Sequence, residues 1–297
     1  MALTKEQKAE WLDVLKATGG NREVMLNSRV IPAWYKDLLG QVEREELLLS
    51  FPDLPSVRVI LTRCPAAGEG CPLHINFHGG GFILPQNEDD DLYCAHLALG
   101  MRGIVVDVDY AKSDENPYPA AARQAYEVTK WVFSKAESWG ADVSRISAGG
   151  HSAGGNLVEY ICMKAGKTGD FTLCLALLDY AATDNHMAME MENASRMQAF
   201  SMLYADGDEA LLKDPYVSPI YASKEDLKAF PPTVIAEAGN CPFTEINRRF
   251  GAMLTEAGVS VSYLSYPESR HGFSVRMVDE WQKAQEDFID VLVKAGR

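Results

Sequence analysis

From residue 57 onward the chain contains short apolar segments bounded by glycine, proline or aspartate, and from Leu73 these alternate with segments of helical periodicity. The apolar segments are 57–62, 72–81, 103–110, 143–152, 171–179, 231–239 and 259–267. The helical segments are 89–101, 119–139, 153–165, 243–258 and 279–296. This alternation predicts an α/β fold, in which a mostly parallel central sheet carries helices on both faces.

Two further regions flank or interrupt this pattern. Residues 1–50 contain helical segments at 5–17 and at about 22–40, so we predict N-terminal helices there. Residues 51–297 then form the main α/β domain, and a chain of 297 residues is long enough for one large core. Within that domain, residues 181–215 are longer than a simple crossover requires, which predicts an inserted cap segment.

Composition excludes several classes of partner. The chain has 28 Lys+Arg and 42 Asp+Glu, a net charge of −14, and its basic residues are scattered, so we expect no nucleic acid partner. Six cysteines without a C-x-x-C pair favour reduced, mostly buried thiols over a zinc site. The N-terminus lacks an apolar signal core and no apolar run is long enough to span a bilayer, so we expect a cytoplasmic protein without membrane contact. Whether the chain forms a homodimer is left open.

The strongest chemical signal is Ser152, which stands in a G-x-S-x-G pentapeptide at residues 150–154. A strand-like segment precedes it and a helix-like segment follows it. A turn of this kind holds the serine in a strained conformation, with its hydroxyl exposed above a helix N-terminus. The motif therefore predicts a nucleophilic serine at the edge of the sheet.

A second glycine-rich segment, H-G-G-G at 78–81, follows another predicted strand. Its uncovered backbone amides can point at an oxygen that becomes negative during acyl transfer. The alternatives are a flexible loop or a phosphate cradle. The G-x-G-x-x-G motif of dinucleotide-binding proteins is not present at the start of a helix. A P-loop ending in Gly166-Lys167-Thr168 would need glycine at residue 161, where the chain has Ile161, so both nucleotide-binding motifs are excluded. We therefore expect no cofactor and no metal.

His271 lies after the last predicted strand and before the C-terminal helix. A single histidine is more often structural than catalytic, but this position follows the serine–acid–histidine order of one class of hydrolases.

Together these motifs resemble the hormone-sensitive-lipase-like branch of the α/β-hydrolases. The matching segments run from residue 57 to the C-terminus and are H-G-G-G at 78–81, 109–120, 150–156, 214–219, 231–239 and H-G-F at 271–273. The resemblance implies that Ser152 is the nucleophile, His271 the base, and the amides of Gly80, Gly81 and Ala153 the oxyanion hole. It also implies that the N-terminal helices and residues 181–215 form a cap over the site.

The acid departs from the family pattern. Laid on the A-x-x-D-P-L signature, residues 238–243 place Cys241 where the family has its catalytic aspartate. We predict that Asp179, at the end of the strand 171–179, replaces that acid, an arrangement similar to that of pancreatic-type lipases. Glu245, in a predicted first helical turn, is a second candidate whose helix-dipole role is the more ordinary explanation. Cys241 acting as a thiolate ranks last, because a thiol is mostly protonated at neutral pH.

The resulting hypothesis is a serine hydrolase of the carboxylesterase type that cleaves short-chain esters through an acyl-enzyme. The short-chain preference is implied by the resemblance. The alternative is a degenerate relative that binds a small apolar ligand without turnover, as plant gibberellin receptors of this family do; Cys241 keeps this alternative open.

Overall fold

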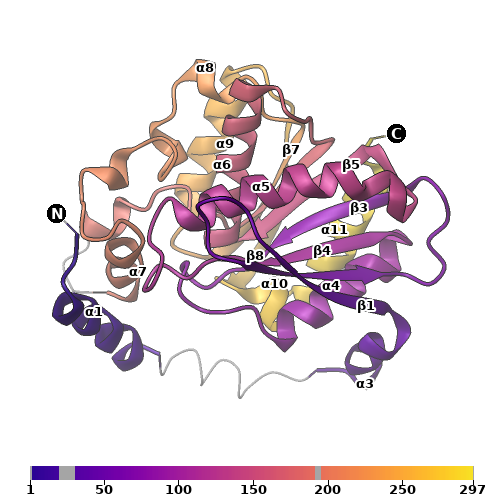
Figure 1. Cartoon of the computed structure of the whole chain (residues 1–297), viewed down its shortest axis with the longest axis horizontal. Helices are drawn as coiled ribbons and strands as arrows, with labels where there is room; N and C mark the ends of the chain where they lie inside the picture. Colours follow the sequence, from indigo (N-terminus) through magenta and orange to yellow (C-terminus); the bar gives the residue numbers. More distant parts are fainter. Residues whose placement is uncertain (1, 20–30, 191–194, 297) are drawn as a thin grey trace.

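The structure is a computed structural model that describes residues 2–19, 31–190 and 195–296. Its described part contains one eight-stranded sheet in the order β1-β2-β4-β3-β5-β6-β7-β8 (Figure 1). The strands are β1 (Glu43–Leu49), β2 (Val57–Arg63), β3 (Cys71–Phe77), β4 (Ile104–Asp109), β5 (Ala141–His151), β6 (Leu175–Asp179), β7 (Thr233–Asn240) and β8 (Val261–Arg270). Strand β2 is antiparallel to β1 and β4, and all other pairs are parallel, so the predicted sheet is confirmed.

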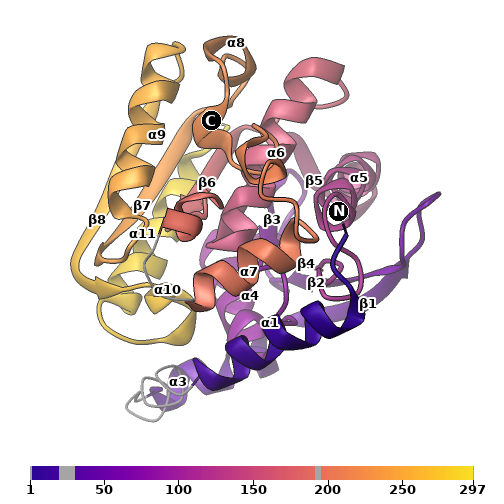
Figure 2. The same cartoon turned by 90° about the vertical axis from the view of Figure 1, so that its left-hand side faces the viewer.

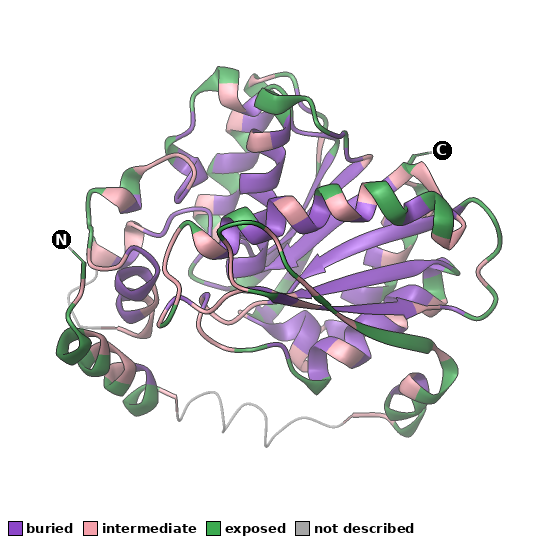
Figure 3. Ribbon diagram, in the orientation of Figure 1, coloured by how far each residue is buried: buried purple, intermediate pink, exposed green. Residues whose placement is uncertain are grey.

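Two layers of helix cover the sheet and divide the core into two apolar clusters. One face carries α5 (Ala120–Lys135), α6 (Ala153–Thr168) and α9 (Thr244–Glu256), and the other carries α4 (Glu88–Met101) and α11 (Trp281–Lys294). Strands facing both layers are apolar on both sides, as in β6, where successive residues alternate between the clusters. Figure 3 shows the consequence, a buried sheet between helices whose outer faces are exposed.

The helix α1 (Lys5–Ala17) packs against α7 (Arg196–Tyr204), and the two lie side by side across the carboxyl ends of the parallel strands (Figure 2). Their contact is a small apolar cluster centred on Leu15, Ala199 and Leu203. The remaining short helices are α3 (Ala33–Lys36), η1 (Asp37–Gln41), η2 (Ala136–Trp139), η3 (Met187–Glu190), η4 (Leu211–Lys213), η5 (Pro219–Tyr221), α8 (Lys224–Leu227) and α10 (Phe273–Arg276).

The N-terminal region differs from the prediction at its end. Residues 43–49 are the edge strand β1 of the sheet, so the N-terminal helical region stops before the predicted boundary at residue 50. The charged first half of β1 is exposed, which explains why its sequence lacks the apolar pattern of a strand. Part of the predicted helix at 22–40 lies outside the described residues, as do 191–194 of the predicted cap segment.

All six cysteines are free thiols and five of them are buried, as predicted. Among the described residues, none of the helices combines the length and the apolar character that crossing a membrane requires.

Candidate active site

Ser152 occupies the sharp turn between β5 and α6, with φ 53° and ψ −116°. A positive φ is strained for a residue with a side chain and persists only where neighbouring structure holds it. The neighbour here is the end of β6: the amide of Ser152 donates to the carbonyl of Asp179 at 3.0 Å, and the amide of Ala182 donates to the carbonyl of Ser152 at 2.9 Å. The sheet edge therefore fixes the serine backbone.

Close backbone approaches around this turn explain its glycines. A Cβ on Gly150 would lie 2.4 Å from the backbone of Gly154, and a Cβ on Gly154 would lie 1.9 Å from the carbonyl oxygen of Phe77. Only glycine lets the first turn of α6 lie directly against the end of β3. The Ser152 hydroxyl is thereby placed beside the loop that follows β3.

That loop is the H-G-G-G segment. Gly80 and Gly81 have φ of 124° and 62°, and a Cβ on Gly81 would lie 2.3 Å from the Phe200 ring. In the described part of the chain, the amides of Gly80, Gly81 and Ala153 donate to no protein acceptor. Three unused donors beside a serine hydroxyl suit the stabilisation of a developing oxyanion.

His271 follows β8 and reaches Ser152 directly. Its Nε2 lies 3.0 Å from Oγ of Ser152, so the structure brings these two predicted site residues together. The ring is held edge-on by Tyr180 at 4.8 Å between centroids and by Phe243 at 5.1 Å. The other ring nitrogen, Nδ1, lies 3.1 Å from Sγ of Cys241.

The structure does not bring Asp179 to His271, which corrects the predicted triad. The Asp179 carboxylate is buried, with Oδ2 at 2.9 Å from Nδ1 of His151 and a hydrogen bond from Ser274. The reason is strand order: β7 separates β6 from β8, so the residue that follows β7, Cys241, meets the residue that follows β8. The second candidate, Glu245, is an exposed residue whose charge acts on Arg248.

Burial sets the charge states of the Cys241–His271 pair. It raises the pKa of the Cys241 thiol to about 12, so the thiol is neutral at physiological pH. Burial, together with the nearby Arg276 guanidinium, lowers the pKa of His271 to about 3. A neutral imidazole can accept the serine proton, but among the described residues no carboxylate forms a hydrogen bond or ion pair with the imidazolium that results.

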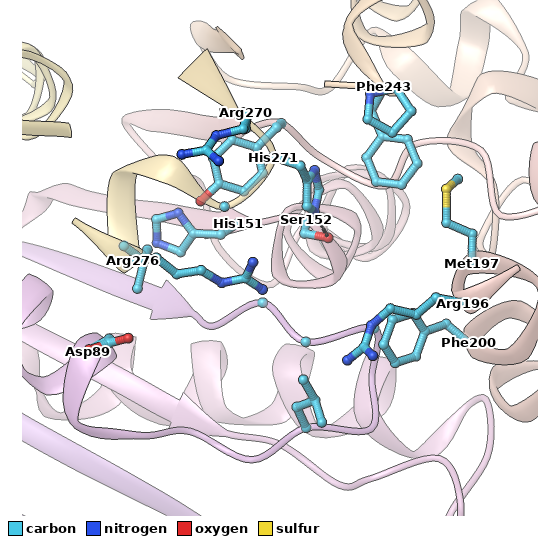
Figure 4. Close-up of a pocket in the computed structure, with 18 of the residues that line it drawn as sticks. Asp89, His151, Ser152, Arg196, Met197, Phe200, Phe243, Arg270, His271 and Arg276 are labelled. Carbon is cyan, nitrogen blue, oxygen red and sulfur yellow. Dashed lines mark hydrogen bonds between the residues drawn. The ribbon is translucent and has the colours of Figure 1, made fainter. Parts of the chain in front are cut away.

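Ser152 lies between two cavities. The larger, of about 660 Å³, is polar on one side and apolar on the other (Figure 4). The polar side carries Asp89, His151, Arg270 and Arg276. The other side is mainly apolar and carries Met197, Phe200 and Phe243, together with Arg196, whose guanidinium lies over the Phe200 ring. A smaller cavity of about 40 Å³ adjoins Gly81, Ser152 and Ala153 on the apolar side. Within the described residues, no cluster of histidine, cysteine, aspartate and glutamate could hold a metal ion.

Sequence reasoning missed the polar residues of the larger cavity. His151 was visible as the residue before the nucleophile, and its pairing with Asp179 follows from the adjacent ends of β5 and β6. Apart from its closeness to His271 in the chain, nothing in the sequence indicates that Arg276 lines the cavity. Its position depends on the short helix α10, which the sequence pattern does not predict.

Known proteins resemble this chain over most of its length. A model of the α/β hydrolase fold matches residues 74–275. Esterase LipI of Mycobacterium tuberculosis is 35% identical over 219 residues, which cover 71% of this chain and 68% of that protein. Carboxylesterase NlhH of the same organism is 30% identical over 246 residues, covering 80% of this chain and 77% of that protein.

Solved structures agree in fold. A hyperthermophilic esterase from Pyrobaculum calidifontis superposes with a TM-score of 0.79 at 24% identity, covering 99% of this chain and 98% of its own. Carboxyl esterase 2 from Tuber melanosporum gives a TM-score of 0.80 at 24% identity, covering 86% and 89%. The family model spans the strained serine turn, the glycine-rich loop and the histidine, and on this evidence the chain belongs to the α/β-hydrolase fold family.

Proposed function

We propose that this protein is a serine hydrolase that cleaves carboxylic esters with short acyl groups, in the manner of the hormone-sensitive-lipase-like branch. The observation that carries the proposal is the 3.0 Å contact between Ser152 Oγ and His271 Nε2 at a strained turn beside unused amides. The named esterases among its relatives, LipI and NlhH, support the same reaction type.

In the proposed mechanism, Ser152 Oγ attacks the ester carbonyl carbon while His271 Nε2 takes its proton. The amides of Gly80, Gly81 and Ala153 stabilise the oxyanion, and the imidazolium returns the proton to the leaving alkoxide. Water then attacks the acyl-enzyme by the same route. Throughout, the Nδ1–H of His271 donates to the neutral sulfur of Cys241, a weak acceptor.

The smaller cavity supports the proposed preference for short acyl groups. Its volume of about 40 Å³ adjoins both the nucleophile and two of the oxyanion donors, Gly81 and Ala153. Phe200, Phe243 and Met197 are among its lining residues, so we expect it to take an acetyl or propionyl group, whereas a long acyl chain would meet these side chains. We therefore assign the acyl group to this cavity and the alcohol part of the ester to the larger one.

Hydrolysis of p-nitrophenyl acetate by the wild type and by Ser152→Ala tests the reaction. We expect the variant to retain less than about a thousandth of the wild-type kcat/KM, the scale of triad knockouts. A fluorophosphonate probe should label the wild type and not the variant. Equal rates for the two proteins, together with no labelling, would contradict the proposal.

Cys241 favours one alternative, a binder of small apolar ligands without turnover, because its neutral thiol cannot stabilise the imidazolium. In that case p-nitrophenyl butyrate would bind the wild type and Ser152→Ala with the same affinity, and neither would release nitrophenol above the buffer rate.

A further inference from the structure

A lysine lies behind the glycine-rich loop and takes no part in the proposed mechanism. Lys112 stands three residues after the end of β4, and its side chain is only 20% exposed. An ammonium group has three N–H donors, and each of them has an acceptor here. They donate to Asp109 Oδ1 at 2.8 Å, to His78 Nε2 at 3.2 Å and to the carbonyl of Tyr110. The ammonium is therefore fixed between a carboxylate and the first residue of the glycine-rich loop.

Lys112 decides which nitrogen of the His78 ring carries the proton. An ammonium has no lone pair, so His78 Nε2 must be the acceptor in their contact. Burial lowers the pKa of His78, so the ring is neutral and its single N–H is on Nδ1. Nδ1 lies 2.7 Å from the carbonyl oxygen of Gly79, to which it donates. Both contacts of the ring therefore require the same tautomer.

Asp109 explains why a cation is needed at this place. Its Oδ1 lies 3.5 Å from His78 Nε2, so without the lysine a carboxylate oxygen and a ring lone pair would face each other. Lys112 bonds both atoms and removes this repulsion. Burial alone would raise the pKa of Asp109, but its neighbours, Lys112 among them, lower it well below its usual range, so the carboxylate is ionised. Arg58 holds the other oxygen, Oδ2, at 3.3 Å.

The Gly79 carbonyl connects the His78 ring to the oxyanion donors. It belongs to the same peptide group as the amide of Gly80, one of the unused donors beside Ser152. Hydrogen bonds in series polarise one another, so a peptide group whose carbonyl accepts a bond has a stronger N–H donor. The preceding carbonyl, that of His78, accepts from the Tyr110 hydroxyl at 2.7 Å, and the two rings stack at 4.3 Å between centroids. The peptide groups of the loop are therefore held from behind.

We propose that Lys112 is a positioning residue for the oxyanion hole, and that it acts through the His78 ring to orient and strengthen the amide of Gly80. This inference rests on the proposed function, because only a reaction that develops negative charge on the ester oxygen uses that amide. Loss of a whole oxyanion donor costs ~10²–10³ in rate. Weakening one donor among three should cost less, and we expect about tenfold.

Hydrolysis of p-nitrophenyl acetate measures the effect on the reaction. We expect kcat/KM to fall by about tenfold in Lys112→Met, which keeps an extended side chain without an N–H donor, and to be mostly retained in Lys112→Arg. Lys130→Met is the matched control, since Lys130 on α5 also pairs with a carboxylate, that of Asp170 at 3.1 Å, and also lies over a tyrosine ring. Its kcat/KM should stay within about twofold of the wild type. Unchanged activity in Lys112→Met, or equal losses in both methionine variants, would overturn the proposal.

Two ketones separate the oxyanion hole from the rest of the cavity. In the proposed reaction Ser152 Oγ adds to the carbonyl carbon of 1,1,1-trifluoro-3-phenylpropan-2-one, its proton passes to His271, and the ketone oxygen becomes an oxyanion. The parent ketone, 1-phenylpropan-2-one, is not activated for this addition. We expect Lys112→Met to raise the inhibition constant of the fluorinated ketone by about tenfold and to leave that of the parent within about twofold. Equal weakening of both would mean that the substitution disturbs the cavity, and would overturn the proposal.

NMR of protein labelled with ¹⁵N-histidine tests the tautomer without turnover. After assignment of the His78 ring, we expect its proton on Nδ1 in the wild type and in Lys112→Arg. In Lys112→Met we expect a proton on Nε2, because Asp109 then becomes the nearest partner of that nitrogen. A wild-type ring protonated on Nε2, or an unchanged ring in Lys112→Met, would overturn the proposal. The wild-type measurement needs no variant, so it tests the proposal even where the methionine variant does not fold.

These measurements distinguish this inference from the proposed function. The expected wild-type tautomer, together with no hydrolysis above the level of Ser152→Ala, would reject the proposed function and leave the contact of Lys112 with His78 in place. Hydrolysis that depends on Ser152 but not on Lys112 would reject the positioning role alone.

Discussion

His271 contacts a good proton donor on one side and a poor proton acceptor on the other. Ser152 Oγ lies 3.0 Å from Nε2, while the neutral Cys241 sulfur lies 3.1 Å from Nδ1. Removing the charge of the acid in a serine protease lowers turnover by ~10⁴, because the tautomer and the imidazolium lose their support. Ser152 and His271 are therefore correctly placed for proton transfer, but the neutral Cys241 thiol stabilises the imidazolium less than a carboxylate would.

Restoring the carboxylate should raise activity. We expect Cys241→Asp to increase kcat/KM for p-nitrophenyl acetate by at least about tenfold, a fraction of the full effect because the surrounding side chains are packed for sulfur. Cys241→Asn is the matched control, since it has the same shape without the charge. Equal activity of the two variants would show that charge at residue 241 does not limit the reaction.

The pH profile gives an independent check at the same residue. Burial and Arg276 lower the pKa of His271 to about 3, so the base stays unprotonated as the pH falls. We expect wild-type kcat/KM to fall by less than about half between pH 7.5 and pH 5. In Cys241→Asp the new negative charge favours the imidazolium, so the acid limb should move to higher pH. If the wild-type kcat/KM fell on the acid side with a midpoint above pH 6, the lowered pKa of His271 would be contradicted.

Among the elements, the contact of α6 with β3 sets the position of the nucleophile. A Cβ on Gly154 would lie 1.9 Å from the Phe77 carbonyl oxygen, so Gly154→Ala must move the helix away from the strand. We expect a loss of about 2–3 kcal/mol in the free energy of unfolding, measured by urea denaturation.

The control for this prediction is Gly68→Ala. Gly68 has open space around its Cβ position and no positive φ, so its variant should change stability by less than about 0.5 kcal/mol. Identical unfolding midpoints for Gly154→Ala and the wild type would mean that the turn relaxes at no cost.

The elements also show how far the sequence predicts the molecule. Most of the parallel strands were predictable because both of their faces are buried where they lie inside the sheet, so their residues read as apolar runs. The strand β1 was not predictable, because an edge strand with exposed glutamates does not read as an apolar run. The motif predicts Ser152 and the chain order predicts His271 as site residues. Which side chain contacts Asp179 depends on the strand that lies between β6 and β8, which these signals do not specify. Side-chain pairing across a sheet edge is set by that order and by register, which local sequence does not contain.

Over the whole molecule, several carboxyl groups are buried, and their burial makes the stability of the fold depend on pH. Asp90, Asp107, Glu159 and Asp179 all have a raised pKa because burial disfavours their charged forms. Glu159, inside α6, is the simplest case. Its Oε1 accepts a hydrogen bond from Thr183 at 2.6 Å, and its Oε2 has no partner among the described residues.

Glu159 should make the protein less stable as the pH rises. Burial raises its pKa to about 8, against about 4.5 in the unfolded chain, so between these values the native state holds a proton that the unfolded state has lost. Stability then falls by up to ~1.4 kcal/mol per pH unit from this group, and the loss ends above pH 8, where both states are ionised. Glu159→Gln removes the titration, so its stability relative to wild type should increase from pH 5.5 to pH 7.5 in urea unfolding. The exposed Glu245→Gln should show no such trend, and parallel curves for Glu159→Gln and wild type would mean that Glu159 is ionised in the native protein.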